Sequence, residues 1–327
     1  MSTLRAPLVH RLAPLASLAP LAAAVAVAVL PALARADTYE NVTFDGPGVD
    51  EVLDGRAYVP DALGEHPPAV IPLHGCGGMW SDDDPSKGGV REIERWGREL
   101  AAQGYVVLAV DSYGGRETGD ATWLEFQYQC NGTAYAGEVD PYTTRVDDIE
   151  AARQYLIDEY DIDVDGGVGL LGWSQGAQSV MIAMAATSKD SNVAYTGTPT
   201  YAGAVAFYPG CGSLLGFGLT STKDGYWRPR SPMRLHHGTA DSYEPTCKRR
   251  ATNAINNYAS GPTSTHALTW AEYAGVGHHF DNQGSTDFPA AKCDAVELAT
   301  PGMEATCAMR DADVDSLAFF LDEVVAD

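Results

Sequence analysis

The chain is short of basic residues. It has 21 Lys and Arg against 44 Asp and Glu, which gives a formal net charge of −23 at pH 7. A surface with this excess of negative charge repels phosphate backbones and anionic lipid headgroups. The composition therefore argues against nucleic acid and against an anionic membrane as partners.

Metal-binding spacings and internal repeats are also missing. The six cysteines include no Cys-x-x-Cys pair, and the eight histidines do not fall into a zinc pattern. We therefore expect neither a metal site nor a cofactor. No repeat or domain boundary appears within residues 37–327, and 45% hydrophobic residues are ample for one large α/β domain.

One long apolar stretch occurs, at the N-terminus. It has a basic start at residues 5–11, a Leu/Ala/Val run over residues 15–33, and a small-x-small pattern, Ala-Arg-Ala, at residues 34–36. Prolines interrupt the run and no stop-transfer pattern follows, which favours a signal peptide over a membrane anchor. We expect cleavage after Ala36, a secreted or periplasmic protein with no membrane attachment, and one mature domain over residues 37–327.

All six cysteines lie in the part that would be exported. An even number of cysteines in an oxidising compartment indicates up to three disulfides. One pairing is local in sequence, a second ties the ends of two predicted strands, and the third is left by elimination. The predicted pairs are Cys293 with Cys307, Cys211 with Cys247, and Cys76 with Cys130.

Strand-like and helix-like segments alternate along the chain. Continuous apolar strands separated by amphipathic helices imply a mostly parallel sheet with helices on both faces. Residues 39–59 are expected to add one or two antiparallel edge strands. The predicted strands are residues 69–73, 105–110, 168–171, 202–208, 233–236 and 267–273, and the predicted helices are residues 90–103, 144–160, 177–186, 248–258 and 314–325.

The pentapeptide Gly-Trp-Ser-Gln-Gly at residues 172–176 has the form Gly-x-Ser-x-Gly. A predicted strand runs into it and a predicted helix follows, which is the context of a nucleophile elbow, a sharp turn that exposes a serine Oγ. The alternative is a glycine turn in which Ser174 only caps the next helix. Partner residues elsewhere in the chain decide between the two interpretations.

Two later predicted strands end beside the groups that a serine nucleophile needs. Asp241 follows the strand at residues 233–236, and His278 follows the strand at residues 267–273. Catalytic groups gather at the carboxyl ends of parallel strands, and the order Ser174, Asp241, His278 is that of an α/β-hydrolase. An imidazole accepts the serine proton, and a carboxylate orients the imidazole. The sequence therefore predicts Ser174 as nucleophile, His278 as base and Asp241 as acid.

Nearby residues offer alternatives to two of these assignments. His279 is an alternative base, and Asp281 or Asp224 is an alternative acid. The first choices rest on a His-x-Phe spacing and on position at a strand exit. His236 and His237 end an apolar strand, where histidines more often pack or form hydrogen bonds than catalyse.

Six short segments occur in an order and spacing typical of one enzyme family. They are residues 74–78 (His-Gly-Cys-Gly-Gly), 111–114 (Asp-Ser-Tyr-Gly), 172–176, 208–210 (Tyr-Pro-Gly), 238–241 (Gly-Thr-Ala-Asp) and 273–281. They extend over most of the predicted mature domain. On these segments the chain resembles the dienelactone hydrolase family of the α/β-hydrolase superfamily.

The resemblance carries implications for the fold and for the site. It implies an α/β-hydrolase fold, with the backbone N–H groups of Cys76 and Gln175 as donors to an oxyanion. The namesake enzymes have a cysteine nucleophile where this chain has Ser174. The resemblance therefore favours an ordinary ester substrate over dienelactone itself.

The connection over residues 114–142 is longer than usual and rich in Gly, Thr and aromatic residues. Long loops in compact domains are often functional, so we expect this one to overhang the site. For the aromatic candidates beside the elbow, the alternative role is packing. The candidate substrate contacts are Tyr113, Arg116, Trp123, Glu125, Tyr128 and Trp173.

These patterns together predict a secreted serine hydrolase that cleaves a carboxylic ester through an acyl-enzyme. The expected partner is a small-molecule or polymeric ester, such as a lactone or a polyester fragment. Two alternatives stay open. One is a peptidase or acyl-peptide hydrolase that uses the same three residues, and the other is a binding protein with a vestigial site.

Overall fold

The computed structural model divides the chain by its internal contacts into Met1–Leu33 and Ala34–Asp327. Residues 1–38 lie outside the described part, so the signal peptide, its cleavage site and the domain boundary stay predictions. The same holds for Trp123, Glu125, Tyr128, Cys130 and Asp224. The structure describes residues 39–81, 84–114, 116, 139–164, 167–185, 201–211, 227, 229–256, 268–284 and 286–325.

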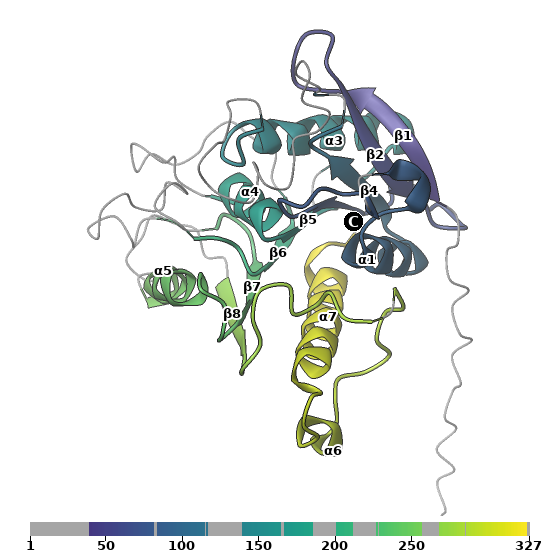
Figure 1. Cartoon of the computed structure of the whole chain (residues 1–327). Helices are drawn as coiled ribbons and strands as arrows, with labels where there is room; N and C mark the ends of the chain where they lie inside the picture. The colour runs from purple at the N-terminus through teal and green to yellow at the C-terminus, as the bar shows by residue number, and fades with distance from the viewer. Residues whose placement is uncertain are drawn as a thin grey trace, which may run out of the picture. The chain divides into compact units, whose positions relative to one another are not determined.

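A mostly parallel sheet runs through the described residues in the order β1-β2-β4-β3-β5-β6-β7-β8 (Figure 1). β1 pairs antiparallel with β2 and β2 with β4, and the remaining neighbours are parallel. The predicted parallel sheet with antiparallel edge strands is confirmed. The strands are β1 (Tyr39–Asp45), β2 (Val52–Tyr58), β3 (Ala69–Leu73), β4 (Val106–Asp111), β5 (Val168–Trp173), β6 (Gly203–Phe207), β7 (Met233–Gly238) and β8 (Leu268–Tyr273).

The helices lie between the strands in sequence and cover the sheet in space. Among those that the structure describes, none combines the length and the apolar character needed to cross a membrane. The helices are α1 (Arg91–Ala102), α3 (Thr144–Tyr160), α4 (Gln175–Ala183), α5 (Glu244–Asn256), α6 (Ala295–Leu298) and α7 (Glu304–Glu323), with a 3-10 turn η2 at Pro85–Lys87.

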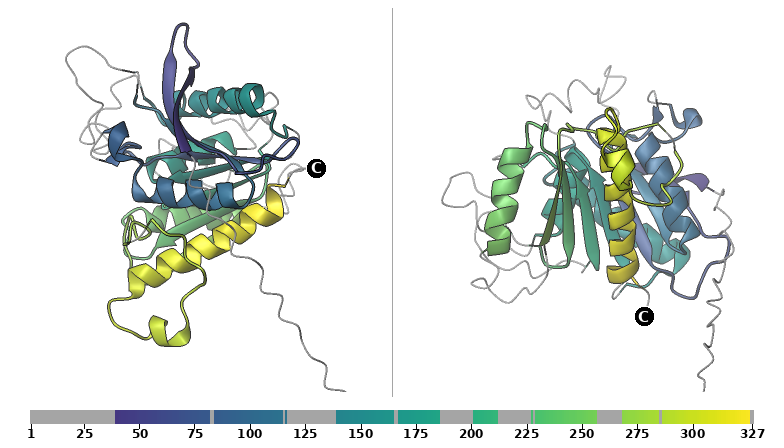
Figure 2. Two further views of the ribbon diagram at one scale, coloured as in Figure 1. Left: turned by 90° about the vertical axis from the view of Figure 1, so that its right-hand side faces the viewer. Right: turned by 90° about the horizontal axis from the view of Figure 1, so that it is seen from below.

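The sheet has two buried faces, each packed against its own set of helices. Along β4, Val106, Leu108 and Val110 pack into the core formed with α3, α4 and α5. Val107 and Ala109, which alternate with them, pack into a second core with α1 and α7. Figure 2 shows α1 and α7 together beside the sheet. Because side chains alternate along a strand, apolar residues at successive positions bury both faces of the sheet.

Helix starts in the C-terminal part differ from the sequence prediction. α7 begins at residue 304, ten residues before the predicted start. Its first turns have little apolar periodicity, and they are held by packing of Ala308 and Ala312 into the second core. The short helix α6 was not predicted, although Asp294 and Glu297 form a capping box that marks its start.

Two of the three predicted disulfides are present. Cys211 bonds to Cys247 with their Cα atoms 5.0 Å apart, and Cys293 bonds to Cys307 with a Cα separation of 5.3 Å. The second of these joins the segment before α6 to the first turn of α7. The third pairing, which involves Cys130, stays a prediction.

A buried charged cluster joins α1 to α7. Arg95 Nε lies 2.8 Å from Asp313 Oδ2, and Trp96 Nε1 donates to Asp313 Oδ1 at 3.2 Å. Arg95 and Asp313 are fully buried. Burial, with Asp281 nearby, raises the pKa of Asp313 to about 7 and the pKa of Glu92 to about 7. Three carboxyl groups, those of Asp313, Asp281 and Glu92, act on the single guanidinium of Arg95. Ionisation of all three carboxyl groups therefore opposes folding.

We expect this cluster to make the fold less stable as the pH rises. The pKa of Asp313 is higher in the folded chain than in the unfolded chain, so its contribution is fully present below about pH 4 and is lost as the pH rises through 7. The loss amounts to at most about 1.4 kcal/mol per pH unit in that window. Asp313→Asn should make the free energy of unfolding, measured by urea titration, vary less with pH between pH 5 and 8. The exposed Glu323→Gln on the same helix is the control, and parallel profiles for Asp313→Asn and the native chain would contradict this account.

Candidate active site

Three of the predicted site residues form one hydrogen-bonded row, which we call the candidate triad: Ser174, His278 and Asp241. Ser174 Oγ lies 2.8 Å from His278 Nε2, and His278 Nδ1 lies 2.6 Å from Asp241 Oδ2. The residues follow β5, β8 and β7 respectively. Since these strands are parallel, their carboxyl ends meet at one edge of the sheet and bring together residues that are distant in sequence.

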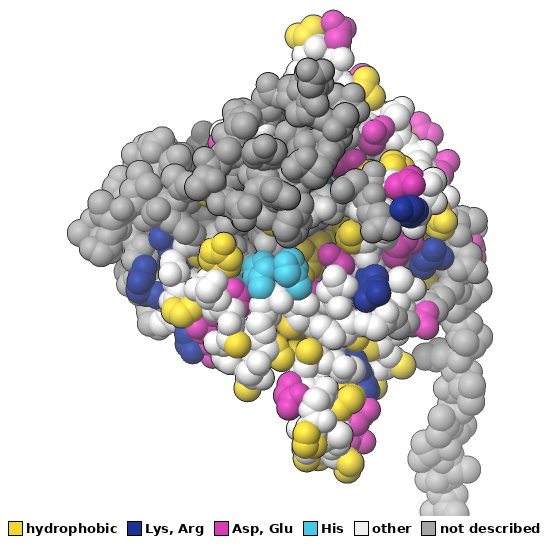
Figure 3. All heavy atoms as spheres, viewed as in Figure 1, with side chains coloured by type: hydrophobic (Ala, Val, Ile, Leu, Met, Phe, Trp, Pro, Cys, Tyr) yellow, Lys and Arg dark blue, Asp and Glu magenta, His cyan; other side chains and the backbone are white. Residues whose placement is uncertain are grey.

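The candidate triad reaches the surface through its imidazole. Asp241 and Ser174 are buried, whereas 23% of the His278 side chain is exposed and the adjacent His279 is exposed. Figure 3 shows histidine side chains open to the surface on this face. A substrate can therefore approach the row from the histidine side.

The turn at Ser174 has the strained backbone of a nucleophile elbow. Ser174 has φ 51° and ψ −112°, a conformation that L-residues rarely adopt. A Cβ on Gly176 would lie 2.2 Å from the carbonyl oxygen of Leu73, and a Cβ on Gly172 would lie 2.7 Å from the backbone of Gly176. The two glycines are needed because strand, turn and helix pack at backbone distance. Ser174 makes no side-chain cap to α4, so the capping alternative is wrong.

The carboxylate of Asp241 is held in its ionised form. Burial alone would raise its pKa, but interaction with the imidazoles of His237 and His278 and a hydrogen bond from the backbone N–H of Tyr243 outweigh burial and lower the pKa below its usual range. The Tyr243 N–H donates to Asp241 Oδ1 at 2.9 Å, and His237 Nδ1 lies 3.4 Å from Asp241 Oδ2. An ionised Asp241 fixes the His278 ring so that Nε2 faces Ser174.

The two alternatives that the structure describes, Asp281 and His279, lie outside this row. Asp281 is fully buried and accepts from Tyr208 Oη at 2.5 Å and from Trp173 Nε1 at 2.8 Å. His279 packs edge-on against the His278 ring, with centroids 4.5 Å apart, and has φ 60°. Asp281 thus anchors the histidine loop to the residue that precedes Ser174, and neither alternative takes the place of a triad member.

The two histidines at the end of β7 take supporting roles. His236 is fully buried, with Nδ1 2.8 Å from Tyr273 Oη and Nε2 2.9 Å from Ser316 Oγ. His237 is also fully buried, and its Nε2 lies 3.1 Å from the carbonyl oxygen of Pro209. Both therefore pack and form hydrogen bonds, as the sequence predicts for histidines at the end of an apolar strand.

The loop after β3 lies against the elbow. A Cβ on Gly75 would lie 3.5 Å from Ser174 Cβ, which places residues 74–78 beside the candidate nucleophile. Gln175 is the first residue of α4, where backbone N–H groups lack partners within the helix. The half-buried Tyr113 connects these segments, since its hydroxyl donates to Gln175 Oε1 at 2.9 Å and also lies 3.3 Å from the Cys76 carbonyl.

Two of the predicted substrate contacts are engaged elsewhere in the structure. Arg116 is buried and forms ion pairs with Asp148 at 2.5 Å and with Glu51 at 2.6 Å. Its guanidinium therefore ties the loop after β4 to α3 and to the residue before β2, in place of the predicted contact with substrate. Trp173 is 1% exposed and donates to Asp281, so packing of the elbow is its role.

Sequence reasoning missed one residue that contacts this region, Arg145 in the first turn of α3. It is fully buried and donates to the His74 carbonyl at 2.7 Å and to Gln175 Oε1 at 3.0 Å. A signal was present, because position 145 precedes Ile149, Ala152 and Leu156 on the apolar face of the predicted helix. An arginine on a buried helix face is a strong indication of a specific partner.

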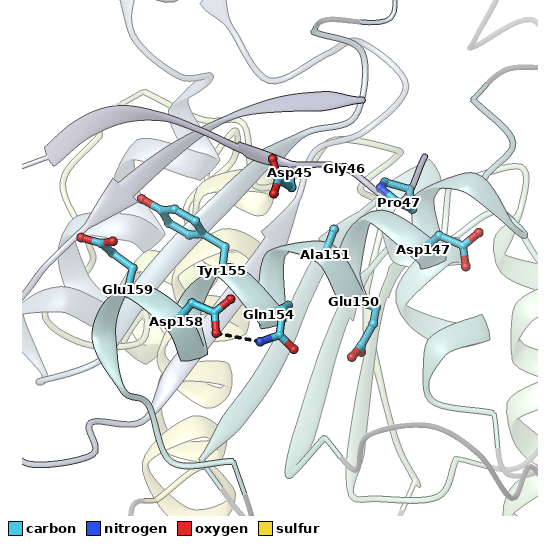
Figure 4. Close-up of a pocket in the computed structure, with 10 residues that line it drawn as sticks. All are labelled: Asp45, Gly46, Pro47, Asp147, Glu150, Ala151, Gln154, Tyr155, Asp158 and Glu159. Atoms are coloured by element: carbon cyan, nitrogen blue, oxygen red, sulfur yellow. Dashed lines mark hydrogen bonds between the residues drawn. The ribbon is translucent and has the colours of Figure 1, made fainter. Parts of the chain in front are cut away.

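A separate cavity of about 610 Å³ lies between the end of β1 and α3 (Figure 4). No member of the candidate triad lines it. Within the described ranges, no group of three or more His, Cys, Asp or Glu side chains is arranged to hold a metal ion. We assign the cavity no part in the chemistry. Its lining residues are Asp45, Gly46, Pro47, Asp147, Glu150, Ala151, Gln154, Tyr155, Asp158 and Glu159.

The backbone contact at Gly176 yields a direct test of the elbow. Gly176→Ala would drive a Cβ into the Leu73 carbonyl, so we expect the free energy of unfolding to fall by about 1–3 kcal/mol, as for other overpacked sites. Gly64→Ala is the matched control, because nothing lies within 4 Å of its added Cβ. Urea unfolding of both variants measures the difference. Equal stability of the two variants would show that β3 and α4 are not packed as described.

Similar solved structures share this fold. One is a putative dienelactone hydrolase from Klebsiella pneumoniae, 14% identical with a TM-score of 0.57, covering 87% of this chain and 99% of that one. Another is an esterase from Thermogutta terrifontis, 15% identical with a TM-score of 0.53, covering 88% and 96%. A puromycin-hydrolyzing peptidase from Mycobacterium tuberculosis is 16% identical with a TM-score of 0.52, covering 92% of this chain and 42% of that one. The chain thus spans less than half of that peptidase.

Sequence comparison gives the family. No curated protein matches the sequence. The model of the dienelactone hydrolase family matches residues 53–306, which include all but the first residue of β2, the whole of β3 to β8 and all three members of the candidate triad. The chain therefore has the α/β-hydrolase fold and is a hydrolase of the dienelactone hydrolase family, to which it belongs.

Proposed function

We propose that the chain is a serine hydrolase that cleaves carboxylic esters through an acyl-enzyme intermediate. The observation that carries the proposal is the row of Ser174, His278 and Asp241, with Oγ–Nε2 and Nδ1–Oδ2 separations of 2.8 and 2.6 Å. These distances are those of direct hydrogen bonds between nucleophile, base and orienting acid. Ser174 is the nucleophile, His278 the base and Asp241 the acid.

In the first half of the reaction, Ser174 Oγ attacks the ester carbonyl carbon while His278 Nε2 takes the hydroxyl proton. Asp241 accepts from His278 Nδ1–H and stabilises the imidazolium that forms. The carbonyl oxygen becomes an oxyanion, which the backbone N–H groups of Cys76 and Gln175 bind. When the C–O bond breaks, His278 gives its proton to the departing alcohol. The acyl group remains bound to Ser174 Oγ as an ester.

In the second half, water replaces the alcohol. His278 Nε2 takes a proton from the water as its oxygen attacks the acyl carbon, and the same N–H groups bind the second oxyanion. Collapse releases a carboxylic acid, and the proton returns from His278 to Ser174 Oγ. The net reaction consumes one ester and one water and yields one acid and one alcohol, with no cofactor.

A peptidase is the second candidate function. It is favoured by two similar structures that are named as peptidases, the puromycin-hydrolyzing peptidase and an acylaminoacyl peptidase from Pyrococcus horikoshii. The chain spans only 42% of each of those proteins. We place the ester first because the chain's own family is named for the hydrolysis of a lactone, which is a cyclic ester.

Export is part of the proposal. The signal-like segment at residues 1–36 supports it, and so do the two disulfides, since such bonds persist in oxidising compartments. In that setting the substrate is a small or polymeric ester outside the cytoplasm, and the acidic composition argues against nucleic acid or anionic membrane as partners.

Replacing the nucleophile tests the proposed activity. Ser174→Ala removes the attacking oxygen, so release of p-nitrophenol from p-nitrophenyl acetate should fall by a factor of about 10⁴ or more. Circular dichroism should show an unchanged fold. The exposed Ser86→Ala serves as the control and should turn over as the native chain does. Undiminished release by a folded Ser174→Ala variant would rule the proposal out.

Replacing the acid tests which carboxylate orients the base. Asp241→Asn keeps the volume but cannot hold the imidazolium, so kcat for the same ester should fall by about 10²–10⁴-fold with little change in KM. The exposed Asp61→Asn, a carboxylate outside the candidate triad, is the control. A kcat for Asp241→Asn within twofold of the native value would remove Asp241 from the mechanism.

A further inference from the structure

The guanidinium of Arg145 lies buried beneath the elbow and the loop after β3. It makes three hydrogen bonds: Nη2 donates to the His74 carbonyl at 2.7 Å, Nη1 to Gln175 Oε1 at 3.0 Å, and Nε to Ser112 Oγ at 3.3 Å. The side chain is fully buried. All three donor nitrogens of this fork are therefore used at the carboxyl ends of β3, β4 and β5.

The acceptors around Arg145 are neutral, which distinguishes it from its neighbour Arg116. Arg116 bonds to the carboxylates of Asp148 and Glu51. The partners of Arg145 are a carbonyl, an amide and a hydroxyl. Burial opposes the charged form and lowers the pKa of Arg145, although an arginine stays protonated in proteins. The carboxylates of Asp148 and Asp111 also interact electrostatically with Arg145, but none of its three hydrogen bonds goes to a carboxylate. The groups that Arg145 contacts directly therefore do not neutralise its charge.

Two of those acceptors belong to the segments that carry the proposed oxyanion donors. Gln175 is itself one of the two donor residues. Cys76 is the other, and it lies two residues after His74 in the same loop. Tyr113 reinforces the same connection, because its hydroxyl donates to Gln175 Oε1 and also lies 3.3 Å from the Cys76 carbonyl. The Arg145 guanidinium lies 5.7 Å from the centre of the Tyr113 ring. The buried Arg145 side chain thus fixes the loop after β3 and the start of α4 relative to each other.

We propose that Arg145 is a positioning residue for the oxyanion hole. Its fork sets the spacing between the backbone N–H groups of Cys76 and Gln175, and its charge lowers the energy of an oxyanion that forms beside them. This inference rests on the proposed serine hydrolase function. Both effects act when charge develops on the carbonyl oxygen, so Arg145 contributes to the transition state much more than to the binding of neutral ester.

The test compares Arg145→Gln and Arg145→Lys with the native chain. Glutamine removes the charge and the fork, while lysine keeps the charge and loses the fork. With p-nitrophenyl acetate, we expect kcat to fall by about 10²-fold in Arg145→Gln, the size seen when one oxyanion donor is lost, with KM within about threefold. The kcat of Arg145→Lys should fall by about 10-fold, which lies between the native value and that of Arg145→Gln. Arg153→Gln, eight residues later on α3, is the control and should leave kcat unchanged.

A tetrahedral inhibitor separates positioning from general loosening. Phenylboronic acid adds the serine oxygen to boron and places a negatively charged tetrahedral centre in the oxyanion hole. Its inhibition constant should rise in parallel with the loss of kcat in both Arg145 variants. If Arg145→Gln does not fold, Arg145→Lys carries the comparison alone.

The outcomes identify which claim fails. A native chain that does not hydrolyse the ester would overturn the proposed function itself. A native chain that is active, with folded Arg145 variants whose kcat and boronate affinity are unchanged, would overturn the role of Arg145 alone. A fall in kcat with native boronate affinity would also overturn it, since the oxyanion hole would then be intact.

Discussion

The close backbone packing of β3, β5 and α4 is the constraint on which the site depends. At Gly176 the chain passes so near to the Leu73 carbonyl that no side chain fits, and Ser174 is held at φ 51° between β5 and α4. Strain of this kind persists only where surrounding structure enforces it. The sheet supplies that enforcement, because apolar residues on both faces of its central strands are buried. The serine is thereby presented at the edge of the sheet to which the histidine loop also returns.

Two buried polar networks then hold the flanking loops in register with the elbow. On one side, Asp281 accepts hydrogen bonds from Trp173 and Tyr208 and so ties the histidine loop to the residue before Ser174. On the other side, Arg145 binds the His74 carbonyl and the side chain of Gln175. Buried polar groups that are well satisfied give such sites rigidity, since any displacement leaves a polar atom without a partner.

The sequence allowed the fold and the three candidate triad residues to be predicted, because both follow from short-range patterns. Apolar strand runs locate β3 to β8, and strand exits locate Asp241 and His278. Two disulfide pairs were also predicted correctly. The start of α7 and the role of Arg145 were not, because both depend on tertiary contacts: burial of Ala308 and Ala312 in the second core, and convergence of three strand ends on one guanidinium. Arg116, predicted to contact substrate, is engaged by carboxylates that no sequence spacing connects to it.

The central claim is that the fold activates one serine. Labelling by a fluorophosphonate probe tests it most directly, because the probe bonds only to a serine whose neighbouring imidazole makes it nucleophilic. Peptide mapping after labelling should show stoichiometric modification at Ser174 alone, with none in chain that has been unfolded in urea beforehand. Absence of labelling in the folded chain, or modification at another serine, would contradict the account.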